Sequence, residues 1–566
     1  IKNMPDKKKL KLVLCWHMHQ PEYRDLQTGE FKLPWTYLHV IKDYVDMVAH
    51  LEAVPEAKAV INFAPILLEQ IEDYANQVSG YLRNGVAITD PLLAALVAPT
   101  IPEEPEDRLR LVKDCMRANR ERQINRYPAF VKLVEMTEWL EQHYGSLCYV
   151  NAQFIHDILV WYHLAWMGET VKLTDSRIKY LIEKGTCYSI HDRIEVVQII
   201  GELLANVIRR YKVLARKGQI ELSVTPYAHP IIPLLLDLNT TLEAMPDADL
   251  PELNGYPGGE DRVKWHLEKG IQTFKRFFGA KPKGCWPSEG SVSQQTLKIL
   301  SDFGFNWTAS GGSVLRNSLN QPENNQPTGI HHPFKLKNTK TACFFRDDGL
   351  SDLIGFEYSK WHADDAIADL IHHLENIAAH EPGDKVVSII MDGENAWEYF
   401  PDNGYHFLSA LYSRLASHPS IELTTFSECL KSKTLVKPLS KLVAGSWVYG
   451  TFSTWIGSSD KNRGWEMLGD VKYAFDKALA TNRLTDKQIQ QAELQLAVCE
   501  GSDWFWWFGD YNPGEAVSNF EQQFRLNLAN LYRLLGEQPP AYLALSFTQG
   551  SGDPAMGGAM RPGIEH

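Results

Sequence analysis

The chain has 566 residues, enough for one large enzyme domain with additions or for two to three domains. Hydrophobic residues make up 44% and charged residues 22%, which is typical of soluble globular proteins and excludes a disordered chain. The formal net charge of -13 argues against nucleic acid as the main partner, because phosphate binding needs clustered positive charge, and it suits a neutral ligand.

Cysteine usage and the lack of a recognisable targeting signal indicate the cell compartment in which we expect the protein. The eight cysteines are scattered and include no C-x-x-C pair, so we expect buried thiols in a reducing compartment and no cysteine-built zinc site. No apolar stretch of signal-peptide length precedes the first predicted strand, and no run is long enough to span a membrane. We therefore expect a cytoplasmic protein, although a chain that begins at Ile1 leaves a processed leader open.

Short apolar runs recur along the first 400 residues and predict strands that are buried on both faces, as in a parallel sheet. These runs are residues 10–16, 59–63, 148–153, 220–224, 284–286 and 386–391. Segments of helical character lie between them, for example 107–125 and 260–278. The alternation predicts an α/β barrel or a doubly wound sheet with large helical insertions.

The pattern changes after residue 435. Thr485 and Gln488 form a capping box that should open a helix running to Glu500 and ending at Gly501. An apolar stripe at helical spacing predicts a second, longer helix and consists of Phe520, Phe524, Leu528, Leu531 and Leu535. We therefore expect a catalytic barrel domain over 8–435, a helical domain over 436–545 and a disordered Gly/Pro-rich tail over 546–566.

Polar residues follow several predicted strands, where α/β barrels build their active sites. After the first strand, His17 and His19 point the same way in an extended segment; they can bind sugar hydroxyls or a metal, or be structural. Near the run 220–224 lie Glu221 and His229. A glutamate in an apolar strand needs a partner, so Glu221 is either a site residue or an ion-paired core residue.

Two later strands carry acidic residues at their ends. Trp286 and Glu289 follow the run 284–286, giving a stacking surface and a carboxylate that can attack an anomeric carbon. The strand 386–391 leads directly into Asp392, with Glu394 close behind. An acid in a partly apolar pocket has a raised pKa, which suits a general acid.

Aromatic residues with interleaved polar groups mark two stretches of the helical part. One contains Trp455 and Trp465, and the other contains Asp503 and Trp504. Both stretches can pack the helical domain onto the barrel or line a carbohydrate groove.

In this order the clusters resemble the five sequence regions of glycoside hydrolase family 57, over about residues 10 to 540. The matching segments are His19-Gln20-Pro21, Gly218-Gln219-Ile220-Glu221, Trp286-Pro287-Ser288-Glu289, Asp392-Gly393-Glu394 and the stretch from Trp455 to Trp465. Residues 346–356 look like the α-amylase and amylopullulanase branch of that family and not like its branching enzymes.

The resemblance implies an incomplete (β/α)7 barrel with inserted helices, a C-terminal helical domain and retaining cleavage of α-glucosidic bonds. It implies Glu289 as nucleophile and Asp392 as general acid/base, with no required cofactor, although calcium stays open. Substrate contacts are then expected from His17, His19, Glu221, His229, Trp286, Asp352, Trp397, Trp455, Trp465, Asp503 and Trp504.

The partner implied is an α-glucan such as starch, glycogen, pullulan or a maltooligosaccharide, cleaved at α-1,4 and possibly α-1,6 bonds. A 4-α-glucanotransferase stays open, since the same intermediate can react with a second glucan. A metal-dependent hydrolase of the amidohydrolase kind would instead use His17, His19, His229 and Asp392 as zinc ligands. A non-catalytic glucan-binding protein is the remaining alternative, and the oligomeric state is open.

Overall fold

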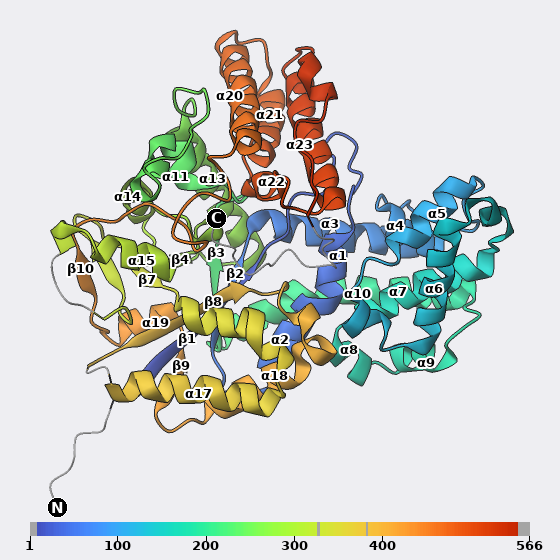
Figure 1. Ribbon diagram of the computed structural model, residues 1–566, viewed down its shortest axis with the longest axis horizontal. Helices are drawn as coiled ribbons and strands as arrows, with labels where there is room; N and C mark the ends of the chain where they lie inside the picture. The colour runs from blue at the N-terminus through green and yellow to red at the C-terminus, as the bar shows by residue number, and fades with distance from the viewer. Residues whose placement is uncertain (1–7, 325–328, 381–382, 553–566) are drawn as a thin grey trace, which may run out of the picture.

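The structure is a computed structural model that describes residues 8–324, 329–380 and 383–552 (Figure 1). A ten-stranded sheet with the order β10-β6-β7-β5-β4-β3-β2-β1-β8 lies at its centre, and β9 pairs with β1. All strand pairs are parallel except β6 with β7. The strands are β1 (Leu10–Met18), β2 (Ala59–Phe63), β3 (Ile220–Val224), β4 (Gly284–Cys285), β5 (Trp307–Ser310), β6 (Phe334–Leu336), β7 (Ala342–Phe345), β8 (Val386–Asp392), β9 (Ile421–Thr424) and β10 (Lys437–Leu439).

Seven of these strands form a ring. β1, β2, β3, β4, β5 and β7 pair in succession, and β8 pairs with the other edge of β1. A parallel bridge between Arg346 and Ser388 joins the end of β7 to β8. The expected incomplete (β/α)7 barrel is confirmed, since a single bridge closes the ring.

Strand alternation turns every second side chain into the ring. The buried interior cluster comes from these alternate positions and from α19 (Phe426–Lys431): Val13, Cys15, Val60, Trp286, Trp307, Ala309, Ala342, Phe344, Val386, Ile390, Phe426 and Cys429. The intervening residues of β1, such as Leu12 and Leu14, belong to the larger core formed with the surrounding helices. The same alternation places His17 and Asp392 at the carboxyl-terminal mouth of the ring.

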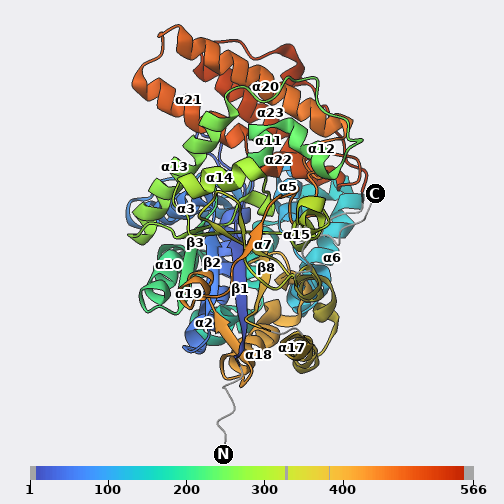
Figure 2. The same cartoon turned by 90° about the vertical axis from the view of Figure 1, so that its left-hand side faces the viewer.

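Three groups of helices surround the sheet (Figures 1 and 2). The larger helices around the barrel are α2 (Val45–Ala53), α3 (Pro65–Asn84), α10 (Ile190–Arg216), α13 (Gly259–Phe278), α14 (Gln294–Asp302), α17 (Ala363–His380) and α18 (Tyr405–Ala416), and the shorter ones are α1 (Trp35–His39), α11 (Ile232–Leu236), α12 (Thr241–Ala244), α15 (Gly312–Leu319) and α16 (Asp348–Asp352). An insertion between β2 and β3 carries α4 (Pro91–Val97), α5 (Pro105–Asp114), α6 (Pro128–Gln142), α7 (Ala152–Trp166), α8 (Glu169–Thr174) and α9 (Ser176–Lys184). The helical domain holds α20 (Ser459–Ala480), α21 (Asp486–Cys499), α22 (Ser502–Trp507) and α23 (Gly514–Leu534), and no helix in the described ranges is long and apolar enough to cross a bilayer.

Two sequence predictions inside the insertion are wrong. Residues 148–153 form no strand: a 3-10 helix ends at Tyr149, and Asn151 caps α7 by accepting a hydrogen bond from the Phe154 amide. The strand prediction is wrong because Asn151 ends the apolar run and starts a helix as its N-cap. The helix expected over 107–125 breaks after Asp114 into a turn and a π-helical segment, Arg120–Ile124.

The helices expected near the C-terminus are confirmed. Thr485 and Gln488 form the capping box of α21, and α23 buries the predicted apolar stripe. β10 joins the sheet through β6, beyond the domain boundary expected at residue 435. The disordered tail expected over 546–566 is not found over 546–552, where the amides of Ser551 and Gly552 donate to the carbonyls of Asp510 and Asn512. Residues 553–566 of that tail lie outside the described residues.

A buried carboxylate joins the helical domain to the barrel. Glu500, fully buried after α21, accepts hydrogen bonds from Arg262 and from the Tyr256 hydroxyl at 2.8 Å, and it lies 3.2 Å from His266. Burial alone would raise the pKa of Glu500, but Arg262 and His266 outweigh it and lower the pKa to about 2. The ionised carboxylate is therefore part of the folded interface.

We expect Glu500→Gln to lower the free energy of unfolding at pH 7 by about 3 kcal/mol, because it leaves the buried Arg262 charge unpaired. The folded pKa lies below the ordinary value of 4.5, so this contribution is present above pH 4.5 and is lost as the pH falls toward 2. Urea denaturation at pH 7 and pH 3 measures both effects. The control is the exposed pair of Glu260 and Lys264 on α13, the helix that also carries Arg262. Glu260→Gln should change the free energy of unfolding by less than about 0.5 kcal/mol. An equal loss in both variants would contradict the interface role.

Candidate active site

The mouth of the barrel carries one row of polar side chains. In the strand register Asp392 of β8 pairs with His17 of β1, His17 pairs with Asn62 of β2, and Asn62 pairs with Ser223 of β3. Because paired residues of parallel strands point to the same face, all four side chains enter the ring at one level. The polar ends of distant strands thus meet at one place.

Glu289 reaches the same mouth from the end of β4. It lies in a 3-10 turn, Ser288–Gly290, with a left-handed φ of 58° that is unusual for a residue with a side chain. Its Oε2 accepts a hydrogen bond from the Trp447 indole at 2.8 Å, and its carbonyl accepts one from the Trp447 amide at 3.0 Å. The strained turn therefore directs the Glu289 carboxyl group toward the barrel mouth, and Trp447 from a later segment stabilises it.

Glu289 and Asp392 line one cleft of about 1080 Å³ and affect each other's ionisation. Burial and the charge of Asp392 raise the pKa of Glu289 well above its ordinary value. Burial raises the pKa of Asp392 to about 6, against the lowering effects of a 2.8 Å hydrogen bond from Asn395 and the charges of His19 and Arg346. Both shifts follow from burial and nearby negative charge, so the pair titrates as a unit and holds a shared proton more readily than separate carboxyl groups would.

Three histidines stand beside this pair. His17 Nδ1 lies 2.6 Å from Oδ1 of Asn62, which can only accept, so we infer that Nδ1 carries the proton. His17 Nε2 then accepts from His229 Nε2 at 3.1 Å, and His229 Nδ1 accepts from the Ser502 hydroxyl at 2.7 Å. Burial first, and then the charge of His19, lower the pKa of His17 to about 3 and that of His229 well below its usual range. Both rings are therefore neutral at neutral pH, and their nitrogens are engaged within the protein.

The third histidine connects the barrel to the helical domain. His19 Nε2 lies 2.9 Å from both carboxylate oxygens of Asp503 on α22, and its ring stacks on His229 at 3.8 Å with an interplanar angle of 5°. Ligand atoms of His19, His229 and Asp503 lie within 4.8 Å of one another. Parallel rings direct their lone pairs side by side instead of toward one point, which favours a hydrogen-bonded platform over a metal site. The carboxylate beside these histidines is Asp503, whereas the zinc hypothesis used Asp392.

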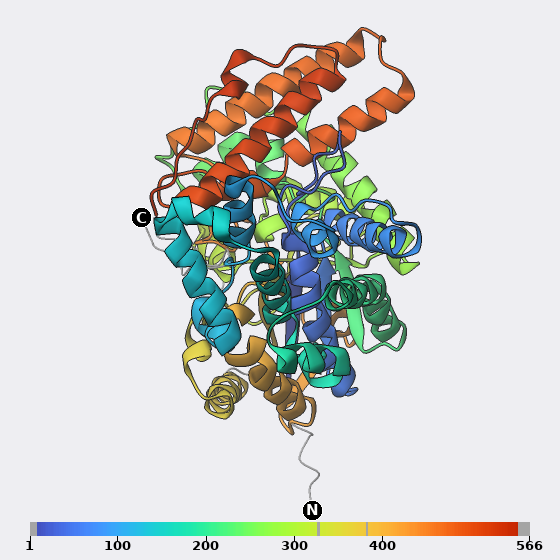
Figure 3. The same cartoon turned by 90° about the vertical axis from the view of Figure 1, so that its right-hand side faces the viewer.

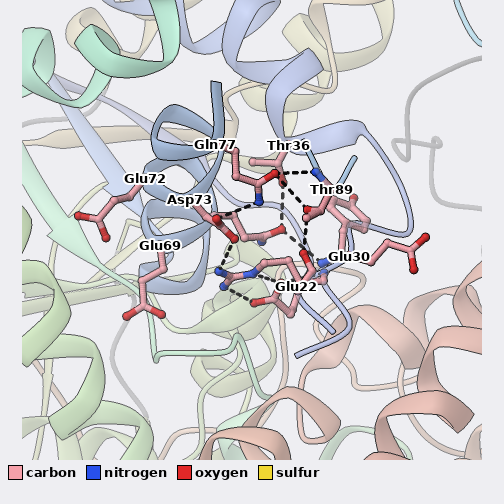
Figure 4. Close-up of polar contacts among 12 residues, drawn as sticks. Glu22, Glu30, Thr36, Glu69, Glu72, Asp73, Gln77 and Thr89 are labelled. Carbon is pink, nitrogen blue, oxygen red and sulfur yellow. Dashed lines mark hydrogen bonds and ion pairs between the residues drawn. The ribbon is translucent and has the colours of Figure 1, made fainter. Parts of the chain in front are cut away.

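The loop that follows His19 is fixed by a polar network (Figure 4). Arg24 donates two side-chain hydrogen bonds to Glu22, at 2.7 and 2.8 Å, and one to Asp73 of α3 at 3.2 Å. On the other side, Asn530 of the helical domain donates to Asp25 at 3.0 Å. The loop is thus clamped between α3 and α23, which keeps the His17 and His19 rings in place.

The five tryptophans expected to bind substrate do not line the cleft. Trp286, Trp397, Trp455, Trp465 and Trp504 are each at most 2% exposed. Three of their indoles donate to carbonyls, from Trp397 to Gly393, from Trp465 to Trp455 and from Trp504 to Val498. The expectation of sugar stacking at these positions is therefore corrected: they pack the barrel and the helical domain. Trp455 and Trp465 are core residues, and the late segments at the cleft include residues 447–449, α22 and the start of α23.

The structure also corrects the expected role of Glu221. It enters the ring two residues before Ser223, one layer below the mouth, and pairs in register with Val60. Its carboxylate accepts hydrogen bonds from the Trp307 indole and from the amide and hydroxyl of Ser427. Glu221 therefore anchors α19 in the floor of the barrel, and the hydrogen bonds that satisfy it come from neutral groups and not from an ion pair.

Other expected residues do reach the cleft, together with several that the sequence did not single out. His17, His19, Asp503 and Asp352 line it, and His229 lies directly behind the other two histidines. The aromatic residues of the cleft wall are Tyr23, Trp35, Tyr144, Phe356, Trp447, Tyr449, Trp506, Trp507 and Phe520. Trp506 and Trp507 belong to an aromatic run of α22. The way α22 packs on the barrel determines which of its side chains face the cleft.

Two further charged residues complete the site. Arg346 donates to the Ile390 carbonyl at 2.8 Å and to Asp352 at 2.9 Å at the rim of the cleft. Glu394 is buried beside Asp392 and accepts hydrogen bonds from Gln20 at 3.1 Å and the Tyr44 hydroxyl at 3.2 Å. Burial and the charge of Asp392 raise the pKa of Glu394 well above its ordinary value.

Solved structures with the same fold are carbohydrate-active enzymes. A GH57-type branching enzyme from Pyrococcus horikoshii has a TM-score of 0.55 and 17% identity, covering 94% of this chain and 93% of that one. An α-amylase from Thermotoga maritima has a TM-score of 0.55 and 12% identity over 93% and 94%. A 4-α-glucanotransferase from Thermococcus litoralis has a TM-score of 0.50 and 15% identity over 93% and 60%. The TM-scores show a common fold, while the identities are low.

The family itself is established from the sequence. No curated protein matches the chain. The sequence model of glycosyl hydrolase family 57, however, matches residues 13–440, about three quarters of the chain, and spans both Glu289 and Asp392. The chain therefore belongs to glycoside hydrolase family 57.

Proposed function

We propose that this protein is a retaining glycoside hydrolase that cleaves α-1,4-glucosidic bonds in α-glucans; cleavage of α-1,6 bonds stays open. The observation that supports this most strongly is the convergence of Glu289 and Asp392, from β4 and β8, on one aromatic-walled cleft where each carboxyl group sits in the other's field. A buried carboxyl pair of this kind is the chemical requirement of glycoside hydrolysis.

In the first step the proton shared by the pair lies on Asp392, which donates it to the glycosidic oxygen while the Glu289 carboxylate attacks the anomeric carbon. The bond to the leaving glucan breaks, and an ester bond between sugar and Glu289 forms. In the second step Asp392 takes a proton from water, whose oxygen displaces Glu289 and restores its carboxylate. Two inversions give net retention, and no step requires a cofactor.

The rest of the cleft suits a neutral polysaccharide. Its aromatic wall offers faces for sugar rings, and Asp352 and Asp503 offer acceptors for hydroxyl groups. Starch, glycogen, pullulan and maltooligosaccharides carry such rings and hydroxyls. We place the chain in the α-amylase and amylopullulanase branch of the family on residues 346–356, whose Arg346 and Asp352 meet at the cleft rim.

Transfer to a second glucan is the alternative outcome of the same chemistry. Trp506, Trp507 and Phe520 of the helical domain face the cleft, and a wall of this kind can hold an acceptor sugar in place of water. Incubation with amylose, pullulan and maltotetraose, followed by chromatography of the products, separates the two outcomes. Shorter products alone indicate hydrolysis, whereas longer oligosaccharides made from maltotetraose indicate a 4-α-glucanotransferase.

We expect Glu289→Gln and Asp392→Asn each to lower kcat on amylose by roughly 10³-fold or more, because each removes one half of the acid–nucleophile pair. Binding of maltooligosaccharides, measured by calorimetry, should persist. Glu398, a buried carboxyl that does not line the cleft, provides the control, and Glu398→Gln should retain activity. Substantial residual turnover in either cleft variant would refute the assignment of roles.

The tryptophans of α22 offer a second test. Trp506 lines the cleft, whereas Trp504, two residues earlier, is buried and donates its indole hydrogen to Val498 at 2.7 Å. We expect Trp506→Ala to raise KM for maltooligosaccharides about tenfold through lost stacking. Trp504→Phe should lower the melting temperature and leave KM unchanged. The reverse pattern would mean that the buried tryptophans, and not those of the cleft wall, bind the glucan.

A further inference from the structure

The loop after β10, residues 443–450, is built onto the turn that carries Glu289. Val292 and Gly445 form an isolated antiparallel bridge, with amide-to-carbonyl hydrogen bonds of 2.9 and 3.1 Å. Two residues after Gly445, the Trp447 amide donates to the carbonyl of Glu289, which lies three residues before Val292. This loop lies beyond residue 440, where the match to the family ends. The turn of Glu289 is therefore supported by a segment more than 150 residues later in the chain.

Close packing fixes the path of the loop. A Cβ on Gly311 would lie 2.5 Å from Cα of Trp447, and one on Gly445 would lie 2.2 Å from the carbonyl oxygen of Gly450. Both distances are shorter than any tolerable contact with backbone atoms, so glycine is required at both positions. Ser446 adds a 2.6 Å hydrogen bond from its hydroxyl to the Thr451 carbonyl. The Trp447 backbone thus has little freedom to move away from Glu289.

The Trp447 side chain lies between Glu289 and Arg346, which contacts the strand that carries Asp392. Its indole nitrogen donates to Oε2 of Glu289, and the Arg346 guanidinium lies 5.5 Å from its ring centroid. The same Arg346 donates from Nε to the carbonyl of Ile390, two residues before Asp392 on β8. Trp286 packs against the indole edge-on at 5.2 Å. An aromatic ring clamped in this way connects the strand of Asp392 to the carboxyl group of Glu289.

We propose that Trp447 is a positioning residue for Glu289: its ring N–H holds Oε2, so that the other oxygen faces the anomeric carbon, and it favours the ionised carboxylate. This proposal rests on the nucleophilic role proposed for Glu289. Among the hydrogen bonds of the described residues, Oε1 of Glu289 has none and stays available for attack. A preorganised donor of this kind avoids the cost of orienting the nucleophile during the reaction.

The ionisation of Glu289 supports the same role. Asp392 and Asp503 face it as negative charges, and both raise its pKa in addition to the effect of burial. The Trp447 hydrogen bond opposes them and lowers the pKa of Glu289. The Arg346 guanidinium lies 5.5 Å from the centroid of the Trp447 ring and is paired with Asp348 and Asp352. The Trp447 hydrogen bond is therefore the contribution that favours the ionised form of Glu289, against burial and the two negative charges.

The test is Trp447→Phe, which keeps an aromatic ring against Arg346 and Trp286 and removes the N–H. We expect kcat on maltooligosaccharides to fall about 10- to 100-fold with little change in KM. The acid limb of the kcat/KM profile should move to higher pH, because losing a hydrogen bond to the carboxylate raises the pKa of Glu289.

Trp465→Phe is the matched control, since it removes an indole hydrogen bond of similar length, 3.0 Å to the Trp455 carbonyl, far from the cleft lining. It should lower thermal stability and leave kcat and the pH profile unchanged. An unshifted profile with kcat within twofold of wild type in a folded Trp447→Phe protein would overturn the proposal. If Trp447→Phe does not fold, Trp447→Leu, which also removes the indole N–H, must shift the acid limb in the same direction, and an unmoved limb overturns the proposal as well. Full activity of Glu289→Gln would instead refute the proposed function.

Discussion

Two carboxyl groups that repel each other share one poorly solvated cleft. The surrounding structure positions them and offsets the free energy of that repulsion. Glu289 and Asp392 come from strands about one hundred residues apart, and the charge of Asp392 adds to burial in raising the pKa of Glu289. The parallel register supplies the first fixed point, since Asp392 lies beside His17 at the barrel mouth. The left-handed turn of Glu289 supplies the second, and Trp447 secures it. A rigid barrel is needed because the free energy of two like charges must be offset by many contacts elsewhere.

The helical domain is a working part of this site and not an appendage. Its Asp503 receives His19, and its α22 brings Trp506 and Trp507 to the cleft wall. Glu500, three residues before Asp503, forms a buried ion pair with Arg262 of the barrel, and this contact helps to fix the position of α22. Folding of the helical domain and completion of the cleft are thereby coupled. Residues of the helical insertion also line the cleft, and Arg117 there pairs with Glu515 at the start of α23. Figure 3 shows the helices of the insertion, in cyan to teal, below the orange and red helical domain.

The sequence predicts the barrel and its acidic pair because both depend on local rules. A buried strand followed by an acid places that acid at the carboxyl end of a parallel sheet, which correctly located Asp392 and Glu289. Tertiary packing decides the rest. Whether Glu221 faces the mouth or the floor depends on a two-residue step in register, and which ring of an aromatic run meets solvent depends on how α22 docks. Trp447 carried no local signal, since its partner lies 158 residues away.

The most direct measurement of the central claim is chemical trapping. A slow substrate such as 5-fluoro-α-D-glucosyl fluoride should leave a sugar ester on the attacking residue, which peptide mass mapping then identifies. The account predicts one adduct, on the peptide that contains Glu289, and none when Glu289 is replaced by Gln. An adduct on Asp392 or Glu394, or turnover of the substrate with no trapped ester, would contradict it.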